Sequence, residues 1–281
     1  PRFFVYPEKI MGNRKEAITP WLFLALPLTI YIWWVIWPML YSFYLSLTSW
    51  DAFSPPVFIG VENFVRLVKD PVFYTSLFNN LEWILVFITI PVALGLMLAM
   101  ALNRNVPGSK LFKASFFSPM VISLVVCGLI WGWLYNPAMG LFNSILRAIG
   151  TDQWTQGWLS DPNLVMESII LVGIWRQVGY VMILYLAGLQ GVDSYLVDAS
   201  KVDGANAFQT FRHVIMPQLA PITVIVIVIS IIDSLRAFDL VSVMTRGGPF
   251  NSSSVLANYM YIQAFNNYRM GYGAAISVII F

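Results

Sequence analysis

The chain has 281 residues, of which 58% are hydrophobic and 11% are charged, and its mean hydropathy of +0.72 excludes an ordinary soluble domain. The formal net charge of +2 is dispersed without a basic run, so we expect no nucleic-acid partner. The single cysteine, Cys127, cannot form an internal disulfide, and no carboxylates stand at metal-ligand spacing from the single histidine, His213. We therefore expect no bound metal.

Six apolar runs dominate the sequence, and about 20 such residues suffice to cross a bilayer as a helix. The runs are too long and too continuous for the alternating strands of a barrel, so the predicted fold class is all-α. Residues 1–19 form an N-terminal segment, and residues 20–281 form one polytopic transmembrane domain. Because the chain starts at Pro1 and stops at Phe281 inside the last run, we expect both ends to be trimmed. In chain order the runs are Trp21–Leu47, Trp83–Leu102, Ala114–Tyr135, Ser168–Leu189, Ile222–Met244 and a sixth, truncated one that begins near Tyr272.

Basic residues beside these runs predict the orientation, because short cytoplasmic loops are enriched in lysine and arginine. With the N-terminus inside, nine of them are cytoplasmic and five are outside. This orientation places residues 1–19 and the loop 190–217 in the cytoplasm. The cytoplasmic set is Arg2, Lys9, Arg14, Lys15, Arg104, Lys110, Lys113, Lys201 and Arg212. The outer set is Arg66, Lys69, Arg147, Arg246 and Arg269.

Two short helices are predicted in the outer loops. The amphipathic segment Glu62–Lys69 is expected to lie in the membrane interface. The segment Leu141–Ile149 is expected to form the second helix. Both would give the outer loops a defined structure.

The loop 190–217, between the fourth and fifth runs, reads as helix, tight turn, helix. Asp193 can cap a helix over Ser194–Lys201, and Asp203, at a turn with Gly204, can cap a second helix over Ala205–Met216. A loop that should face water carries an apolar face, which indicates a partner with a groove for it. The alternative is an amphipathic re-entrant segment. The apolar residues are Leu196, Val197, Val202, Phe208, Phe211 and Val214.

The same loop resembles the EAA motif of permeases from bacterial ABC importers. Asp198-Ala199-Ser200 is followed after three residues by Gly204 and after nine more by Val214-Ile215-Met216-Pro217. The family pattern is Glu-Ala-Ala, three residues, Gly, nine residues, Ile-x-Leu-Pro, so the spacing, the glycine and the proline match. Further segments resemble the carbohydrate-uptake branch of that family. These are Gly60–Phe64, Asp70–Phe73, Asn79-Asn80, Met244–Pro249, Tyr259, Tyr261, Ala264-Phe265 and Gly271–Ala275.

This resemblance implies the six-helix type I importer fold in a bacterial inner membrane. It also implies a second homologous permease, two ATP-binding cassette subunits and an extracytoplasmic solute-binding protein as partners. ATP and magnesium would be bound by the partner subunits, and this chain would bind no cofactor. The loop would act as a coupling helix that docks into a cleft of the ATPase. Its candidate coupling residues are Leu196, Asp198, Ala199, Ser200, Asp203, Gly204, Ala205, Phe208 and Pro217.

The sequence predicts no enzymatic activity. It holds no phosphate-binding pattern of Gly, four residues, Gly-Lys-Ser/Thr, so if the chain is a component of an ABC transporter, the energy must come from another subunit. A single histidine also leaves no basis for a catalytic triad or a histidine proton relay.

Polar residues recur every three positions through the fifth run, and Arg176 interrupts the fourth. A charge at the middle of a bilayer costs about 2.5–3.5 kcal/mol on insertion scales, so these residues should face the bundle interior or water. They could line the substrate pathway, or they could form mutually neutralising structural pairs. Arg176 could pair with a carboxylate or recognise an acidic saccharide such as an alginate-type oligosaccharide. The candidate pathway residues are Arg176, Ser230, Asp233, Arg236, Asp239 and Ser242.

Two classes of function are compatible with these features. The favoured one is the permease subunit of an ATP-driven importer that moves a carbohydrate. The alternative is a secondary transporter driven by an ion gradient, with Asp233, Arg236 and Asp239 as coupling charges. A membrane scaffold without transport activity would leave the polar stripe unexplained.

Overall fold

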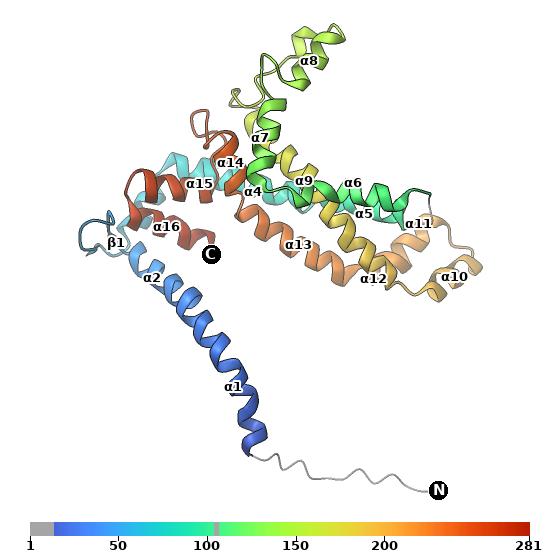
Figure 1. Ribbon diagram of the computed structural model, residues 1–281, viewed down its shortest axis with the longest axis horizontal. Helices are drawn as coiled ribbons and strands as arrows, with labels where there is room; N and C mark the ends of the chain where they lie inside the picture. Colours follow the sequence, from blue (N-terminus) through green and yellow to red (C-terminus); the bar gives the residue numbers. More distant parts are fainter. Residues whose placement is uncertain (1–13, 104–106) are drawn as a thin grey trace.

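The computed structural model describes residues 14–103 and 107–281, and almost all of its elements are helices (Figure 1). Arg2, Lys9 and Arg104, which entered the orientation prediction, lie outside the described residues. Three helical stretches are long and apolar enough to cross a membrane, two further candidate spans are sharply bent, and a shorter apolar helix ends the chain. The predicted all-α, polytopic architecture is confirmed.

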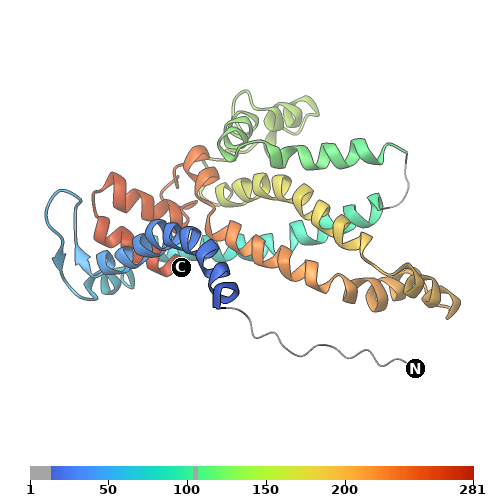
Figure 2. The same ribbon diagram turned by 60° about the horizontal axis from the view of Figure 1, so that its bottom comes forward.

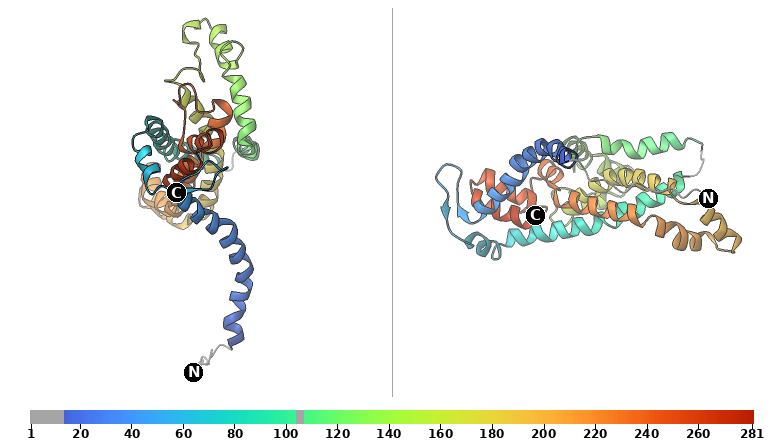
Figure 3. Two further views of the ribbon diagram at one scale, coloured as in Figure 1. Left: turned by 90° about the vertical axis from the view of Figure 1, so that its left-hand side faces the viewer. Right: turned by 90° about the horizontal axis from the view of Figure 1, so that it is seen from below.

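The first span stands apart from the bundle. It consists of α1 (Arg14–Tyr31), a π-helical turn (Ile32–Ile36) and α2 (Trp37–Ser46). None of its most apolar window is buried, and α2 packs mainly on α16 at its outer end. The left view of Figure 3 shows α1 extending away from the rest of the molecule. Apart from this contact with α16, the arm presents apolar side chains to lipid or to a partner.

The second span begins earlier than the apolar run predicts. A short antiparallel pair, β1 (Thr48–Ser49) and β2 (Val57–Phe58), and α3 (Glu62–Leu67) precede α4 (Pro71–Phe87) and α5 (Ile90–Leu102). The Oδ1 atom of Asp70 accepts a hydrogen bond from the Val72 amide at 2.9 Å, and proline follows as the first helical residue. These start signals place the first turns of the helix before Trp83.

The third run is not one continuous helix, so that prediction is wrong. It divides into α6 (Ser109–Val121) and α7 (Leu124–Leu134), which meet at 100°. Ser123 caps α7 by accepting a hydrogen bond from the Val126 amide at 3.3 Å. The helix predicted over Leu141–Ile149 is confirmed as α8 (Leu141–Ala148), and a 3-10 turn follows over Asp152–Trp154.

Helix α9 (Val165–Gln190) is the centre of the bundle. It packs against α5, α6 and α13, which lie alongside it in Figure 2. Its contact with α6 is close, because a Cβ atom on Gly179 would lie 1.8 Å from the carbonyl oxygen of Phe116. The fourth predicted span is therefore confirmed and extends to both sides of the apolar run.

The fifth run is also divided, between Leu235 and Phe238, and each half is a separate helix. The loop 190–217, the end of α5 and the start of α6 lie at one end of the bundle, and β1 lies at the other (Figure 1). Both broken spans have their breaks beside the middle of α9. The remaining elements are α10 (Ser194–Val202), α11 (Ala207–Thr210), a π-helical turn (Phe211–Ile215), α12 (Met216–Gln218), α13 (Ala220–Leu235), α14 (Phe238–Met244), α15 (Leu256–Tyr261), a π-helical turn (Ile262–Asn266) and α16 (Met270–Ile280).

Candidate functional site

The loop 190–217 folds into two short helices joined by a left-handed turn. Asp193 caps α10 by accepting a hydrogen bond from the Tyr195 amide at 2.8 Å, as predicted. Gly204 has φ +82°, and the Ala205 amide donates to the Ser200 carbonyl at 2.9 Å. Glycine adopts this conformation without the steric penalty of a Cβ atom, so Gly204 sets the angle between the two helices.

The predicted cap of the second helix is wrong. Asp203 closes α10, since its amide donates to the Ala199 carbonyl. The cap of α11 is Asn206, whose side chain accepts from the Gln209 amide at 2.9 Å, and Gln209 accepts from the Asn206 amide at 2.8 Å. This reciprocal capping box satisfies two amides that would otherwise lack partners.

The loop exposes apolar side chains at its tip. Val202 is 88% and Phe208 is 70% exposed, and Leu196 is also exposed. Val197, Phe211 and Val214 are partly buried, so only half of the predicted apolar set forms the outer face. The exposed side chains remain available for a partner because the loop is held together from inside.

Polar contacts supply that internal support. The hydroxyls of Ser200 and Thr210 lie 3.0 Å apart and join α10 to α11. At the base of the loop, Gln218 accepts a hydrogen bond from the Asp193 amide at 3.1 Å. Asp198 pairs with Lys201 at 2.8 Å on the exposed surface. The loop is therefore a preformed elbow rather than a flexible connection.

The predicted coupling residues divide into two groups. The first lines a hollow of about 380 Å³ between the two helices: Leu196, Ala199, Ser200, Asp203 and Pro217, together with Val214, His213 and Gln218. The second group, Asp198, Gly204, Ala205 and Phe208, lies outside this hollow. A groove and a ridge on the same elbow suit insertion into a protein cleft.

A second site lies where the two broken spans meet α9. A cavity of about 180 Å³ brings together Arg176, Asp233, Arg236 and Asp239, four of the six predicted pathway residues. Ser230 is fully buried and Ser242 does not line the cavity. The helix breaks between Leu235 and Phe238, so the three-residue spacing does not continue on one helix face from Asp233 to Ser242. Ser230 lies before this break and is buried in the packing of α13.

The charged side chains that line this cavity do not form ion pairs with one another. In the described part of the chain, none of the carboxylates here lies within 4.0 Å of a guanidinium group. Gln177 donates to the Oδ2 atom of Asp233 at 3.4 Å, and Arg176 donates to the Met120 carbonyl near the end of α6 at 3.4 Å. Asp233 and Arg236 are exposed in the isolated chain, so the cavity opens sideways.

Two residues at this site were missed by the analysis of the sequence. The Nε1 atom of Trp83, a residue 2% exposed, is buried without a hydrogen-bond partner in the described residues, as is the Nε atom of Arg176. Asn80 donates to the Ser234 carbonyl at 3.0 Å and accepts from the Leu256 amide at 2.7 Å. The available signal for the second residue was the pair of adjacent amides, Asn79-Asn80, in a helix that crosses the membrane domain.

Helix ends surround the cavity. Leu124, at the N-terminus of α7, and Asp239, in the first turn of α14, both line it. Discontinuous helices place polar backbone ends and partial charges inside a membrane domain, and they are typical of substrate sites in transporters. The fold, with its discontinuous helices around a charged cavity, defines a polytopic helical membrane protein of the transporter class.

Comparisons with known proteins agree with this class. Residues 83–281 match the family model described as "Binding-protein-dependent transport system inner membrane component". A protein named "Probable ABC transporter permease protein YurN" from Bacillus subtilis is 38% identical over 273 residues, covering 96% of this chain and 93% of that protein. The trehalose/maltose transport system permease protein MalF from Thermococcus litoralis is 30% identical over 271 residues, covering 95% and 90%.

A solved structure shows the same fold. The crystal structure of a bacterial ABC transporter involved in the import of the acidic polysaccharide alginate contains a chain that matches with a TM-score of 0.80 at 23% identity. The match covers 95% of this chain and 93% of that chain. The chain described here belongs to the family of inner membrane components of binding-protein-dependent transport systems, and it has the type I importer fold. It is a transport component rather than an enzyme.

Proposed function

We propose that this chain is the permease subunit of an ATP-driven ABC importer that carries a carbohydrate across the inner membrane. The observation that carries the proposal is the preformed elbow of α10 and α11, with Val202 and Phe208 exposed at its tip. Relatives named for trehalose/maltose and starch-product transport support the substrate class. The N-terminus is assigned to the cytoplasm, on the same side as the elbow.

The elbow would couple two ATP-binding cassette subunits, which hold ATP and magnesium, to the membrane helices. It continues into α13 through a 69° bend. Helix α13 has 16 residues, about 24 Å in length, and its far end carries Asp233 beside the charged cavity. Displacement of the elbow on ATPase closure would therefore tilt one wall of the cavity and switch its access.

The charged cavity would be part of the substrate pathway. Its volume of about 180 Å³ is below the range of about 300–1,000 Å³ found for complete ligand pockets, and it opens sideways. A second, homologous permease would supply the other half of the pathway. Buried N–H donors on Trp83 and Arg176 suit an oxygen-rich ligand, and Arg176 with Arg236 would favour an acidic saccharide. An extracytoplasmic solute-binding protein would deliver the sugar.

A decisive experiment separates this function from ion-driven transport. The chain is co-expressed with its partner permease and ATPase subunits, purified through a tag on this chain and reconstituted in proteoliposomes with the solute-binding protein. Co-purification of the ATPase and sugar uptake that requires ATP are the expected results. Uptake that survives ATP depletion but stops with an uncoupler would instead support the secondary transporter, which family membership disfavours.

A further inference from the structure

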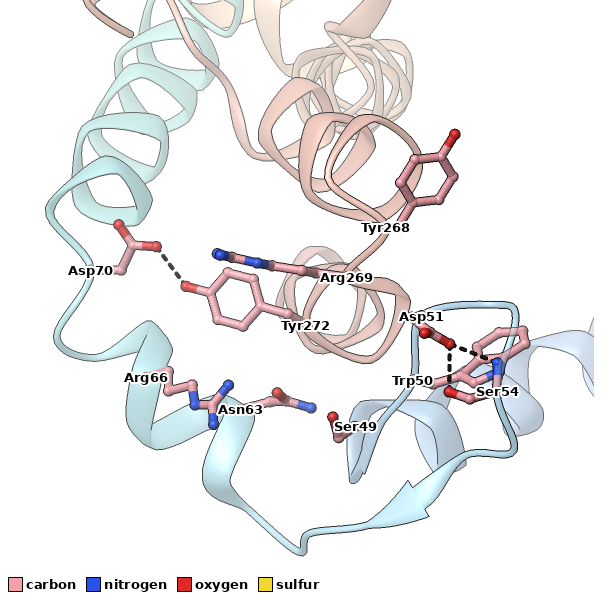
Figure 4. A pocket seen from close by; sticks show the side chains of 10 residues that line it. All are labelled: Ser49, Trp50, Asp51, Ser54, Asn63, Arg66, Asp70, Tyr268, Arg269 and Tyr272. Atoms are coloured by element: carbon pink, nitrogen blue, oxygen red, sulfur yellow. Dashed lines mark hydrogen bonds between the residues drawn. The ribbon is translucent and has the colours of Figure 1, made fainter.

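A polar pocket lies at the end of the molecule that carries β1, opposite the elbow and away from the charged cavity (Figure 1). Its volume is about 490 Å³, within the range found for small-molecule sites. Four segments form it: the loop after β1, α3, the start of α4 and the start of α16. In Figure 4, Arg269 extends alongside the ring of Tyr272, and Asn63 and Arg66 from α3 lie on another side.

The pocket is built on a fixed frame. Asn63, 2% exposed, donates to the carbonyls of Ser46 and Thr48, each at 2.9 Å. Asp70 accepts a hydrogen bond from Tyr272 at 2.6 Å and another from Tyr259. Burial opposes ionisation, but these hydroxyls outweigh it and hold the pKa of Asp70 below its ordinary value. The carboxylate therefore joins α4, α15 and α16 as a stable anion.

The rim is also defined by tertiary contacts. The rings of Phe53 and Tyr268 lie 5.2 Å apart and close the loop after β1 onto the start of α16. Tyr268 has φ +54° and Ala52 has φ +74°, which are strained conformations for residues with a Cβ atom. Hydrogen bonds from Ser54 lower the pKa of Asp51 to about 2, so this rim carboxylate remains an acceptor at physiological pH.

The chemistry of the lining matches a sugar better than a charged ligand. The formal charges of the lining, on Asp51, Asp70, Arg66 and Arg269, sum to zero, and Arg66 also pairs with Glu62 beside the pocket. Planar carboxylate, amide and guanidinium groups offer donors and acceptors to neighbouring hydroxyls. The rings of Trp50 and Tyr272 add apolar faces against which the C–H face of a sugar ring can pack. An acidic peptide or a phosphate would find no net positive charge here.

We propose that this outer pocket binds a short saccharide, as a site separate from the cavity between α9 and α13. Arg269 and Asp51 engage hydroxyl groups, and the aromatic rings hold the sugar face. Binding at this site does not require coupling to ATP hydrolysis, so this proposal can be tested separately from the proposed transport function. It would give a released sugar a first position on the permease outside the membrane pathway.

The test measures saturation transfer from protein to sugar by NMR, using the purified transporter complex in lipid nanodiscs without the solute-binding protein. The probes are maltotriose and trigalacturonate. Maltotriose should bind more tightly than the anionic trigalacturonate, because the lining carries no net positive charge, and Arg269→Ala or Trp50→Ala should weaken maltotriose binding roughly tenfold or more. The matched controls Lys69→Ala and Trp154→Ala, which change an exposed cation and an exposed indole outside the pocket, should have no effect.

A second comparison separates the two sites. The double variant Arg176→Gln/Arg236→Gln should leave the Arg269-dependent signal intact. Binding that disappears in this double variant but survives Arg269→Ala and Trp50→Ala would overturn the proposal, as would the absence of binding by both probes. If the pocket variants alter attachment of the solute-binding protein but not of the probes, the pocket is a protein-docking surface and the proposal is wrong. Size-exclusion profiles verify that each variant remains assembled.

Discussion

The left-handed turn at Gly204 gives the sharpest test of the coupling elbow. Its φ of +82° lies in a region that costs a residue with a Cβ atom about 1–2 kcal/mol. No atom lies within 4 Å of the position that a Cβ would occupy, so a substitution here acts through backbone strain and not through a clash. In Gly204→Val the population of the correctly bent elbow should fall roughly 5- to 30-fold relative to distorted forms.

The assay compares ATP hydrolysed with sugar imported in proteoliposomes that contain the complete transporter. We expect Gly204→Val to lower the sugar imported per ATP while attachment of the solute-binding protein stays normal. Gly204→Asn is the matched control, because asparagine tolerates the left-handed region far better than valine and should retain most of the coupling. Normal coupling in the valine variant, or equal damage in the asparagine variant, would refute the reasoning from backbone strain.

Three further predictions concern the elbow tip, the cavity and the outer end. Phe208→Ala should weaken binding of the ATPase, measured by co-purification, by roughly one to two orders of magnitude, since a fully buried side chain of this size contributes about 1.5–3 kcal/mol. The control Lys201→Ala should have little effect. Equal losses in both variants would contradict the proposed contact of Phe208 with the ATPase. Arg176→Gln/Arg236→Gln should reduce uptake of acidic saccharides more than of neutral ones, whereas unchanged uptake of both would remove the pathway role. Asp70→Asn should lower the melting temperature of the complex at pH 7. The folded pKa of Asp70 is depressed, so the stabilisation from its carboxylate is present above the unfolded pKa and is lost as the pH falls through the folded pKa. The difference in melting temperature between Asp70→Asn and wild type should therefore persist from pH 7 to pH 5 and disappear in stronger acid. A difference that disappears by pH 5 would contradict this assignment.

Local signals in the sequence predicted the parts of the elbow that local chemistry controls. The Asp193 cap and the Gly204 turn each depend on a few neighbouring residues, and both are confirmed. The sequence also offered Asp203 as the cap of the second helix. Asn206 is the observed cap because its side chain and that of Gln209 each accept a hydrogen bond from the other residue's backbone amide. The Asn-x-x-Gln spacing was readable, and it should outrank a lone aspartate before glycine.

The breaks in the membrane spans were harder to predict. The cap at Ser123 starts α7 inside an apolar run, and a serine in such a run is compatible with an unbroken helix as well. The end of α13 has no proline or glycine to mark it. Its Ser234 carbonyl is instead held by Asn80, a residue 154 positions away in the chain. The hydropathy of the sequence therefore located the charged residues in the membrane spans but did not predict the helix breaks that bring them together.

Asn80 also imposes a mechanical condition on the cycle. Its side-chain amide donates a hydrogen bond to the last turn of α13 and accepts one from the first turn of α15. If the elbow moves α13 in the way proposed above, then either α15 moves with α13 or the two hydrogen bonds of Asn80 break.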